Sequence, residues 1–363
     1  MTLTTGSRTR RRLLLASDRT DRSSDLWAIL QCAADVDTTL TSGIPDRPDG
    51  RFSGIVVDVS LRSPESVLQV RSKLCVDAYR SMPRLFVLAD ALHHESMQAW
   101  ALGATDTISR PLDAQVVLQR VRAAFPDDND SGAAANANAL NRGISAAHAV
   151  LVKIFENLPA GVPLSFSDVM EAEQEILMAI KLSSLRDWLA TVGRHHTHTY
   201  RHCLFVTGFA AAFAQQLGMR EEDQRRLARA ALLHDVGKAF IPVAILDKPG
   251  KLDNEEKNEI RRHARLGYEA LLRQGGFPSE MLDVVLHHHE MLDGSGYPDG
   301  LRGDQISDIV RLTTIVDIHA ALVEKRAYRL PFTHAKSFAT MEEMGGKLDQ
   351  HLLQAFRPVA LGC

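Results

Sequence analysis

Residues 287–298 read His-His-His-Glu-Met-Leu-Asp-Gly-Ser-Gly-Tyr-Pro, and a His234-Asp235 pair followed by Gly237 and Lys238 lies about fifty positions earlier. Adjacent His and Asp residues, with further His residues in separate segments, supply the imidazole and carboxylate ligands that a fold can gather around two divalent ions. The histidine run continues into a glycine-rich turn, a combination that ordinary packing rarely supplies. Together these segments indicate a metal-dependent phosphodiester hydrolase.

The half of the chain that carries these segments has the apolar spacing of helices. From His195 onward the strand signal disappears, and amphipathic stretches occupy residues 199–217, 221–234, 254–274, 278–289 and 303–324. We therefore predict an all-α bundle, a scaffold that builds metal sites from side chains on facing helices.

This pattern resembles the HD-GYP domain family of the HD superfamily, bacterial phosphodiesterases of cyclic di-GMP. The resemblance covers residues 195 to about 357 and implies seven metal ligands in chain order: His202, His234, Asp235, His263, His288, His289 and Asp317. In family members thought to hold three metals, a Glu occupies the position of His198, four residues before His202 on the same helix face. His198 is therefore either a ligand of a third ion or an exposed or outer histidine. His195, His196 and His287 have no assigned role.

The resemblance also implies the substrate contacts. Glycines allow a tight turn and a close backbone approach, while a tyrosine offers a face for a base or a hydroxyl for a phosphate. Asp293 is expected to orient a ligating His or an ordered water, and Arg326 either contacts phosphate or belongs to a solvated charge cluster. The expected substrate contacts are Lys238, Asp293, Gly294, Gly296, Tyr297, Pro298 and Arg326.

The reaction implied is hydrolysis of cyclic di-GMP to pGpG, and to GMP after a second cut. Asp235 and Lys238 are the expected catalytic residues: Asp235 would bridge two ions that hold a hydroxide nucleophile, and Lys238 would stabilise negative charge on the phosphate. Two divalent ions are expected, with a third left open. Iron or manganese comes first among the metals, and nickel or zinc would also fit such ligands.

Three positions after Asp317 depart from the family pattern. Ala320 stands where a second Asp is usual, and Val323 and Glu324 replace a Thr-Ser pair. These substitutions leave the metal ligands unchanged, but we expect them to affect how the substrate is positioned and how fast it is turned over. An alternative function is therefore a metal-loaded sensor that binds cyclic di-GMP without significant hydrolysis. Hydrolysis of another cyclic dinucleotide is a third reading.

Residues 11–125 alternate strands and helices. Segments 12–16, 54–59, 84–89 and 105–109 are predicted strands, separated by helical segments such as 64–74 and 94–102. Regular alternation predicts an α/β domain with a doubly wound parallel sheet, whose functional crevice lies at the carboxyl ends of the strands.

The acidic residues at those strand ends resemble a response-regulator receiver domain. Asp58 matches the phosphoacceptor and Asp18 one member of the acidic pair that holds magnesium. However, Ser17 stands where a second acid is usual, Ala89 where the family has Thr or Ser, and Arg110 where it has Lys. Either Asp58 is phosphorylated, or the domain is a pseudo-receiver used for dimerisation or partner docking, and a sensor kinase or signalling partner is expected in the first case.

Length and composition predict a two-domain globular protein. The 363 residues are 45% hydrophobic and 24% charged, and the net charge of −3 gives no reason to invoke nucleic acid. We expect a receiver-like domain at 1–125, a small polar linker at 126–145, connecting helices at 146–194 and the HD-GYP domain at 195–363. The connecting helices either pack into the catalytic domain or pair with a second copy, so a homodimer is one expectation.

The expected location is the cytoplasm. Cys32, Cys75, Cys203 and Cys363 are scattered without a close pair, as in a reducing compartment. The apolar run 13–16 that follows an arginine cluster is too short for a signal peptide. No stretch approaches the roughly twenty apolar residues that would span a bilayer.

Overall fold

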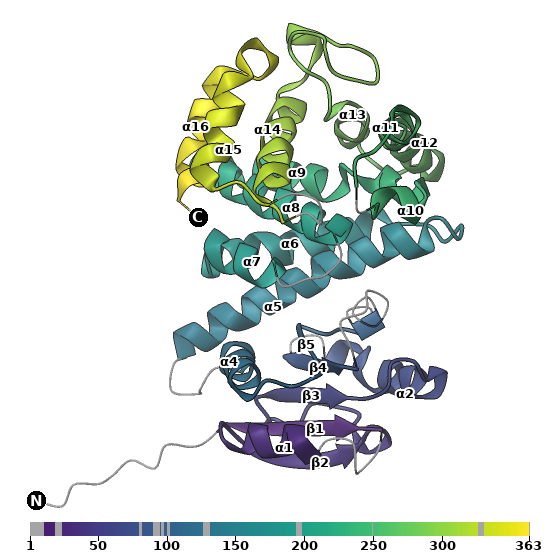
Figure 1. Ribbon diagram of the computed structural model, residues 1–363, viewed down its shortest axis with the longest axis vertical. Coiled ribbons are helices and arrows are strands. Elements are labelled where there is room, and N and C mark those ends of the chain that lie inside the picture. Colours follow the sequence, from purple (N-terminus) through teal and green to yellow (C-terminus); the bar gives the residue numbers. More distant parts are fainter. Residues whose placement is uncertain are drawn as a thin grey trace, which may run out of the picture. The chain divides into compact units, whose positions relative to one another are not determined.

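In the computed structural model the chain divides into two compact units, Met1–Ser145 and Ala146–Cys363. The structure describes residues 11–18, 24–79, 82–89, 95, 98–99, 102–125, 131–193, 198–248, 250–325 and 330–362. One unit is an α/β sheet and the other is helical (Figure 1). The predicted two-domain arrangement is therefore confirmed.

The first unit is built on a parallel sheet of five strands in the order β2-β1-β3-β4-β5. Helices α1 and α4 pack on one face of the sheet, where Leu13 and Leu15 of β1 join their apolar residues in one core. This confirms the predicted α/β sheet. The elements are β1 (Arg12–Ser17), α1 (Ser24–Gln31), β2 (Asp35–Leu40), η1 (Thr41–Gly43), β3 (Gly54–Asp58), α2 (Pro64–Leu74), η2 (Asp77–Tyr79), β4 (Arg84–Leu88), β5 (Asp106–Ser109) and α4 (Ala114–Ala124).

Strand β2 was not among the predicted strands. Its sequence, Asp-Val-Asp-Thr-Thr-Leu, lies at the edge of the sheet and is only partly buried. An edge strand needs little apolar surface, so a pattern search for apolar runs misses it. The predicted helix 94–102 lies mostly outside the described residues.

The second unit is helical throughout its described part, as predicted. Its elements are α5 (Ser131–Val152, which begins in the first unit), the π-helical turn η3 (Lys153–Asn157), α6 (Phe166–Leu182), α7 (Leu185–Val192), α8 (His198–Gln216), α9 (Glu221–Leu233), η4 (Val236–Phe240), α10 (Val243–Leu246), α11 (Asn254–Arg261), α12 (His263–Gln274), α13 (Ser279–His287), η5 (Gly303–Gln305), α14 (Asp308–Val323), α15 (His334–Glu343), η6 (Gly345–Lys347) and α16 (Gln350–Leu361). No helix in the described residues is both long enough and apolar enough to cross a membrane.

Three features of this unit differ from the sequence-based expectations. Helix α5 begins at Ser131, inside the segment 126–145 expected to be a polar linker, because its alanines favour a helix even without an apolar period. The stretch 254–274 is two helices that meet at Arg262. Helices α15 and α16 were not predicted.

Helix α8 forms the centre of the helical unit. It packs against α6, α7, α9, α14 and α16, and it is buried on nearly all sides rather than on one amphipathic face. Small residues permit this close packing: a Cβ at Gly208 would lie 2.5 Å from the Trp188 ring, whose Nε1 donates to the Leu204 carbonyl at 2.9 Å. The scaffold thereby brings α8, α9 and α14 together, and each of them supplies residues of the site.

Candidate metal centre

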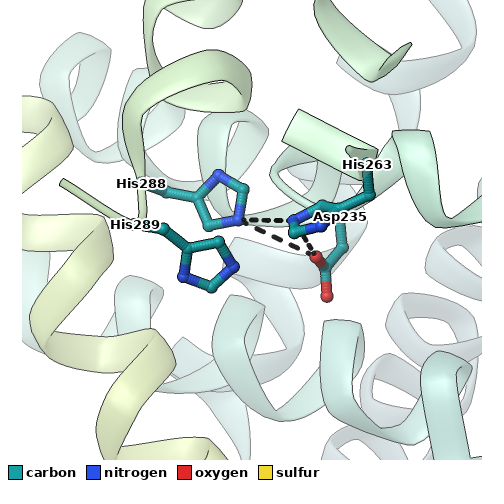
Figure 2. Close-up of side chains that lie close together, drawn as sticks. All are labelled: Asp235, His263, His288 and His289. Carbon is teal, nitrogen blue, oxygen red and sulfur yellow. Dashed lines mark hydrogen bonds and ion pairs between the residues drawn. The ribbon is translucent and has the colours of Figure 1, made fainter. Parts of the chain in front are cut away.

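The structure brings all seven predicted metal ligands into two adjacent groups. Ligand atoms of the first group lie within 4.8 Å of one another, and so do those of the second. Figure 2 shows the first group, in which His263 from the start of α12 and the adjacent His288 and His289 after α13 lie near the Asp235 carboxylate. The first group is Asp235, His263, His288 and His289, and the second is His202, His234 and Asp317.

The Asp235 carboxylate lies between the two groups. Its Oδ1 is 3.3 Å from His263 Nε2 and 3.8 Å from His288 Nε2. Its Oδ2 is 3.2 Å from His234 Nε2 and 3.7 Å from His202 Nε2. One oxygen thus faces each group, which is the arrangement that a carboxylate bridging two ions requires.

Backbone carbonyls fix the tautomers of three histidines. His234 Nδ1 lies 2.7 Å from the Ala231 carbonyl, His263 Nδ1 2.6 Å from the Ile260 carbonyl, and His288 Nδ1 3.0 Å from the Val284 carbonyl. A carbonyl oxygen only accepts, so each Nδ1 carries the proton and donates it. Each Nε2 therefore presents a lone pair to the centre of the site, the form in which a neutral imidazole binds a metal.

These lone pairs make the site fit a cation. His263 Nε2 and His288 Nε2 face each other at 3.3 Å. Burial lowers the pKa of His263 to about 4 and the pKa of His288 well below its usual value, so neither gains a second proton at neutral pH. Within the described residues, the buried His234 Nε2 and Asp235 Oδ1 also lack a hydrogen-bond partner. Two acceptors pointing at each other repel, and a divalent ion held between them would remove that repulsion.

The second group is joined by a close contact between His202 and Asp317. His202 Nε2 lies 2.9 Å from Asp317 Oδ1, and its Nδ1 lies 3.4 Å from Glu324 Oε2. Burial by itself lowers the pKa of His202, but the hydrogen bonds to Asp317 and Glu324 outweigh it and raise that pKa to about 9. Asp317 Oδ2 also lies 3.7 Å from His289 Nδ1, so this carboxylate reaches toward both groups.

Lys238 pairs with the Asp235 carboxylate. Its Nζ lies 2.5 Å from Asp235 Oδ2, and its side chain is 20% exposed. Helix α9 ends at Leu233, and Gly237 lies inside η4. The glycine is needed for space, since a Cβ there would lie 1.8 Å from the His263 carbonyl oxygen. Close contact between η4 and α12 thus brings Asp235 to His263.

The glycine-rich loop is folded back on the histidine run. Gly294 has a φ of 77°, a conformation that favours glycine. A Cβ at Gly296 would lie 2.4 Å from the Glu290 Cα. The buried Glu290 carboxylate anchors the far end of the loop, because it accepts from the backbone N–H groups of residues 299, 300 and 301 at 2.7, 3.0 and 3.1 Å.

An aromatic and cationic stack lies beside the first group. The Tyr297 ring is stacked on His289, with centroids 4.7 Å apart, and the exposed Arg261 guanidinium lies 5.2 Å from the Tyr297 centroid. His289 and Lys238 are the partly exposed members of the site, at 24% and 20%. The stack and Lys238 thus contribute aromatic surface and positive charge beside the metal ligands.

Other predicted residues take different positions. His198 belongs to neither group, and its Nε2 lies 3.5 Å from Glu324 Oε2. His287 lies between Asp283 and Asp299, at 2.7 and 3.0 Å. Asp293 is exposed and accepts from the Ser295 N–H at 2.9 Å, so it shapes the turn rather than orienting a histidine. Pro298 is also exposed and follows a cis peptide bond. Arg326, His195 and His196 lie outside the described residues.

Arg110 pairs with two acidic residues of the sheet unit, Asp58 and Asp25. Asp58, fully buried, accepts from Arg110 Nη2 at 2.9 Å, and Asp25 accepts from Nη1 at 2.6 Å. The hydrogen bond with Arg110 lowers the pKa of Asp25. Asp18 accepts from the Ser60 N–H at 2.7 Å and from the Ser66 hydroxyl at 3.2 Å.

Three contributors to the site were missed from sequence. Glu290 stands inside the motif but was given no role, although its acidic side chain follows two ligands directly. Arg261 lies two residues before His263. Glu324 comes seven residues after Asp317 and directly follows the last residue of α14, and this short separation could have signalled a shared role.

Comparison with known proteins agrees with this geometry. Residues 174–352 match the HD domain family. Cyclic di-GMP phosphodiesterase PA4108 of Pseudomonas aeruginosa is 32% identical over 213 residues, which cover 58% of this chain and 51% of that protein. Cyclic di-GMP phosphodiesterase response regulator RpfG of Xanthomonas campestris pv. campestris is 42% identical over 140 residues, 38% of this chain and 37% of that protein.

A third relative has a different nucleotide in its name. The 3'3'-cGAMP-specific phosphodiesterase 3 of Vibrio cholerae serotype O1 is 41% identical over 146 residues, 40% of this chain and 32% of that protein. The chain spans about half or less of the length of these three curated relatives. The family match begins in α6 and includes both ligand groups and the loop. Over residues 174–352, the helical unit of this chain is therefore similar to the HD domain family.

Proposed function

We propose that this protein is a metal-dependent phosphodiesterase that hydrolyses cyclic di-GMP to pGpG, with GMP as the product of a second cut. The observation that carries the proposal is the position of Asp235, with one carboxylate oxygen facing each of two groups of histidine lone pairs. Two divalent ions, iron or manganese, would suit these two groups. When bound, such ions supply an activated water and positive charge for phosphoryl oxygens.

The residues of the chain itself have three tasks in this proposal. Asp235 and the histidines would fix the geometry of the centre, and backbone carbonyls set the tautomers of His234, His263 and His288. Lys238 places a positive charge where negative charge develops on the phosphate. Tyr297 and Arg261 offer an aromatic surface and a guanidinium, which suit a guanine or the second phosphate of a cyclic dinucleotide.

Product analysis tests the proposal. Protein reconstituted with iron or manganese is incubated with cyclic di-GMP, and the products are separated by chromatography. We expect pGpG or GMP from the unmutated protein and none from Asp235→Ala. Parallel incubations with 3'3'-cGAMP determine the nucleotide preference, since relatives named for both substrates match this chain. A fully metal-loaded protein that binds cyclic di-GMP but releases no product would contradict the proposal and favour a sensor.

For the sheet unit, receiver-like in its layout, we propose a docking or dimerisation role without phosphorylation. Arg110 donates to the carboxylate of Asp58, the predicted phosphoacceptor. Its guanidinium would therefore compete with magnesium and with the incoming phosphoryl group for this carboxylate. Incubation with acetyl phosphate and magnesium, followed by intact-mass measurement, should show no added phosphate. A stoichiometric mass increase that Asp58→Asn abolishes would identify a working phosphoacceptor.

The proposed substrate and the scattered cysteines favour a cytoplasmic location.

A further inference from the structure

A buried carboxylate that the family resemblance does not explain, Glu324, lies beside the second ligand group. Glu324 follows the last residue of α14, and its side chain is fully buried. It stands where the resembled pattern has a serine. A buried carboxylate needs partners, because an isolated buried charge is strongly disfavoured.

Glu324 is held by one cation and faces two imidazoles. Its Oε1 accepts from Arg201 Nε at 2.8 Å, and Arg201 Nη2 donates to the Lys325 carbonyl at 2.7 Å. Its Oε2 lies 3.4 Å from His202 Nδ1 and 3.5 Å from His198 Nε2. Because Arg201 already neutralises this carboxylate, the contacts favour an orienting role over binding of a third metal ion.

His202 differs from the other histidines in how its tautomer is set. His234, His263 and His288 each donate Nδ1–H to a carbonyl three or four residues earlier on their own chain segment. In the described part of the chain, Glu324 is the carboxylate that faces His202 Nδ1, while Asp317 and Asp235 face its Nε2. A proton on Nε2 would be donated to Asp317 and would block that nitrogen as a ligand.

We propose that Glu324, oriented by Arg201, is a positioning residue that holds the proton of His202 on Nδ1 and thereby leaves Nε2 available for a metal ion. The inference rests on the metal centre of the proposed function. Carboxylates that accept from the second nitrogen of a ligating histidine typically contribute about 10- to 100-fold to metal affinity.

Glu324→Gln is the direct test, because it keeps the shape of the side chain and removes its charge. Glu173→Gln is the matched control: Glu173 is equally buried, pairs with Arg229 between α6 and α9, and lies outside both ligand groups. Metal affinity is measured by chelator competition, with metal content per chain as a second readout. We expect Glu324→Gln to bind one of the two ions about 10- to 100-fold more weakly, and Glu173→Gln to bind as the unmutated protein does.

Histidine tautomers give a readout that lost packing alone would not change. In zinc-loaded protein with ¹⁵N-labelled histidine, His202 should show a protonated Nδ1 and a metal-bound Nε2, with the assignment made from His202→Gln. Glu324→Asp, which keeps the charge, should retain this signature if Glu324→Gln is too unstable to study. Equal metal affinity in Glu324→Gln and Glu173→Gln, or a protonated Nε2 in the zinc-loaded protein, would overturn the inference. Neither readout depends on which nucleotide is the substrate.

Discussion

The two units both gather carboxylates where secondary-structure elements end, but they balance the charge in different ways. At the carboxyl end of the sheet, Arg110 donates to Asp58 and Asp25, so a built-in cation fills the acidic pocket. In the helical unit, Asp235 has Lys238 on one side, and the remaining space holds imidazole lone pairs rather than donors.

The sheet unit thus holds a completed pair of opposite charges, whereas the helical unit holds a site that suits a bound cation. A carboxylate bonded to arginine stabilises the fold only while both partners remain, because removing one leaves a buried charge. A group of imidazole nitrogens with their protons turned away lacks positive charge, and a metal ion supplies it. The sheet unit therefore balances these carboxylates with its own arginine, whereas the two ligand groups of the helical unit suit a metal ion.

The largest expected effect comes from making the same substitution in both pockets. Asp235→Asn removes the charge shared by the two ligand groups, so we expect kcat to fall at least about 10³-fold and metal content to drop in both groups. Asp58→Asn should leave kcat within about twofold, because Asp58 belongs to the sheet unit and to neither ligand group. Steady-state kinetics and metal analysis check both variants, and comparable losses of kcat would remove the contrast between the pockets.

Removing the built-in cation should mainly change stability. Arg110→Met leaves the fully buried Asp58 without its guanidinium, so the free energy of unfolding of the sheet unit should fall by about 3 kcal/mol. Hydrogen exchange of β1 and β3 in increasing urea measures this change. Arg51→Met is the control, since Arg51 pairs with Asp49 at the surface and should contribute much less to the free energy of unfolding. Equal effects would mean that Arg110 is an ordinary surface cation.

The free energy of unfolding of the helical unit should fall at acid pH, and one buried histidine, His148, allows part of this fall to be measured. Burial lowers the pKa of His148, which packs against Tyr200, to about 3. In the unfolded chain this histidine titrates near 6.5, so below that pH the unfolded state binds a proton that the folded state does not. The contribution of neutral His148 is present above pH 6.5 and decreases as the pH falls toward 3.

His148→Phe isolates this contribution from the other buried histidines, which are the same in both proteins. Between pH 7 and pH 5 the unmutated protein should lose about 2 kcal/mol more free energy of unfolding than His148→Phe. Urea denaturation at several pH values measures the difference. Parallel pH profiles for the two proteins would show that His148 is not held neutral by burial.

The sequence predicted the ligands better than it predicted what surrounds them. His202, His234, Asp235, His263 and Asp317 were named from the resemblance to the HD-GYP family, whose ligands match short local patterns in this chain, and the structure gathers them in the two groups. The Arg201–Glu324 contact joins residues 123 positions apart, and only the packing of α8 against α14 brings them together. Local pattern carries no information about such a pair.

A similar limit applies to the fold. The apolar strands β1, β3, β4 and β5 were predicted because both of their faces are buried, while the polar edge strand β2 was missed. The break between α11 and α12 lies at Arg262, where no Gly or Pro marks it in the sequence. This break nevertheless sets the start of α12, the helix that carries His263. Backbone direction at that point follows from tertiary packing.

The smallest expected effect concerns substrate binding beside the metal groups. Arg261 lies over Tyr297 with its guanidinium exposed, so Arg261→Ala should raise KM for cyclic di-GMP about tenfold and leave kcat nearly unchanged. Arg262→Ala is a matched control, because the neighbouring Arg262 is exposed and pairs with Glu259. If both variants raise KM equally, general positive charge near the site is responsible. If only Arg261→Ala raises KM, the stack of His289, Tyr297 and Arg261 is part of the substrate site. The helical unit would then bind the nucleotide, like the metal ions, through side chains whose binding groups are not already paired within the fold.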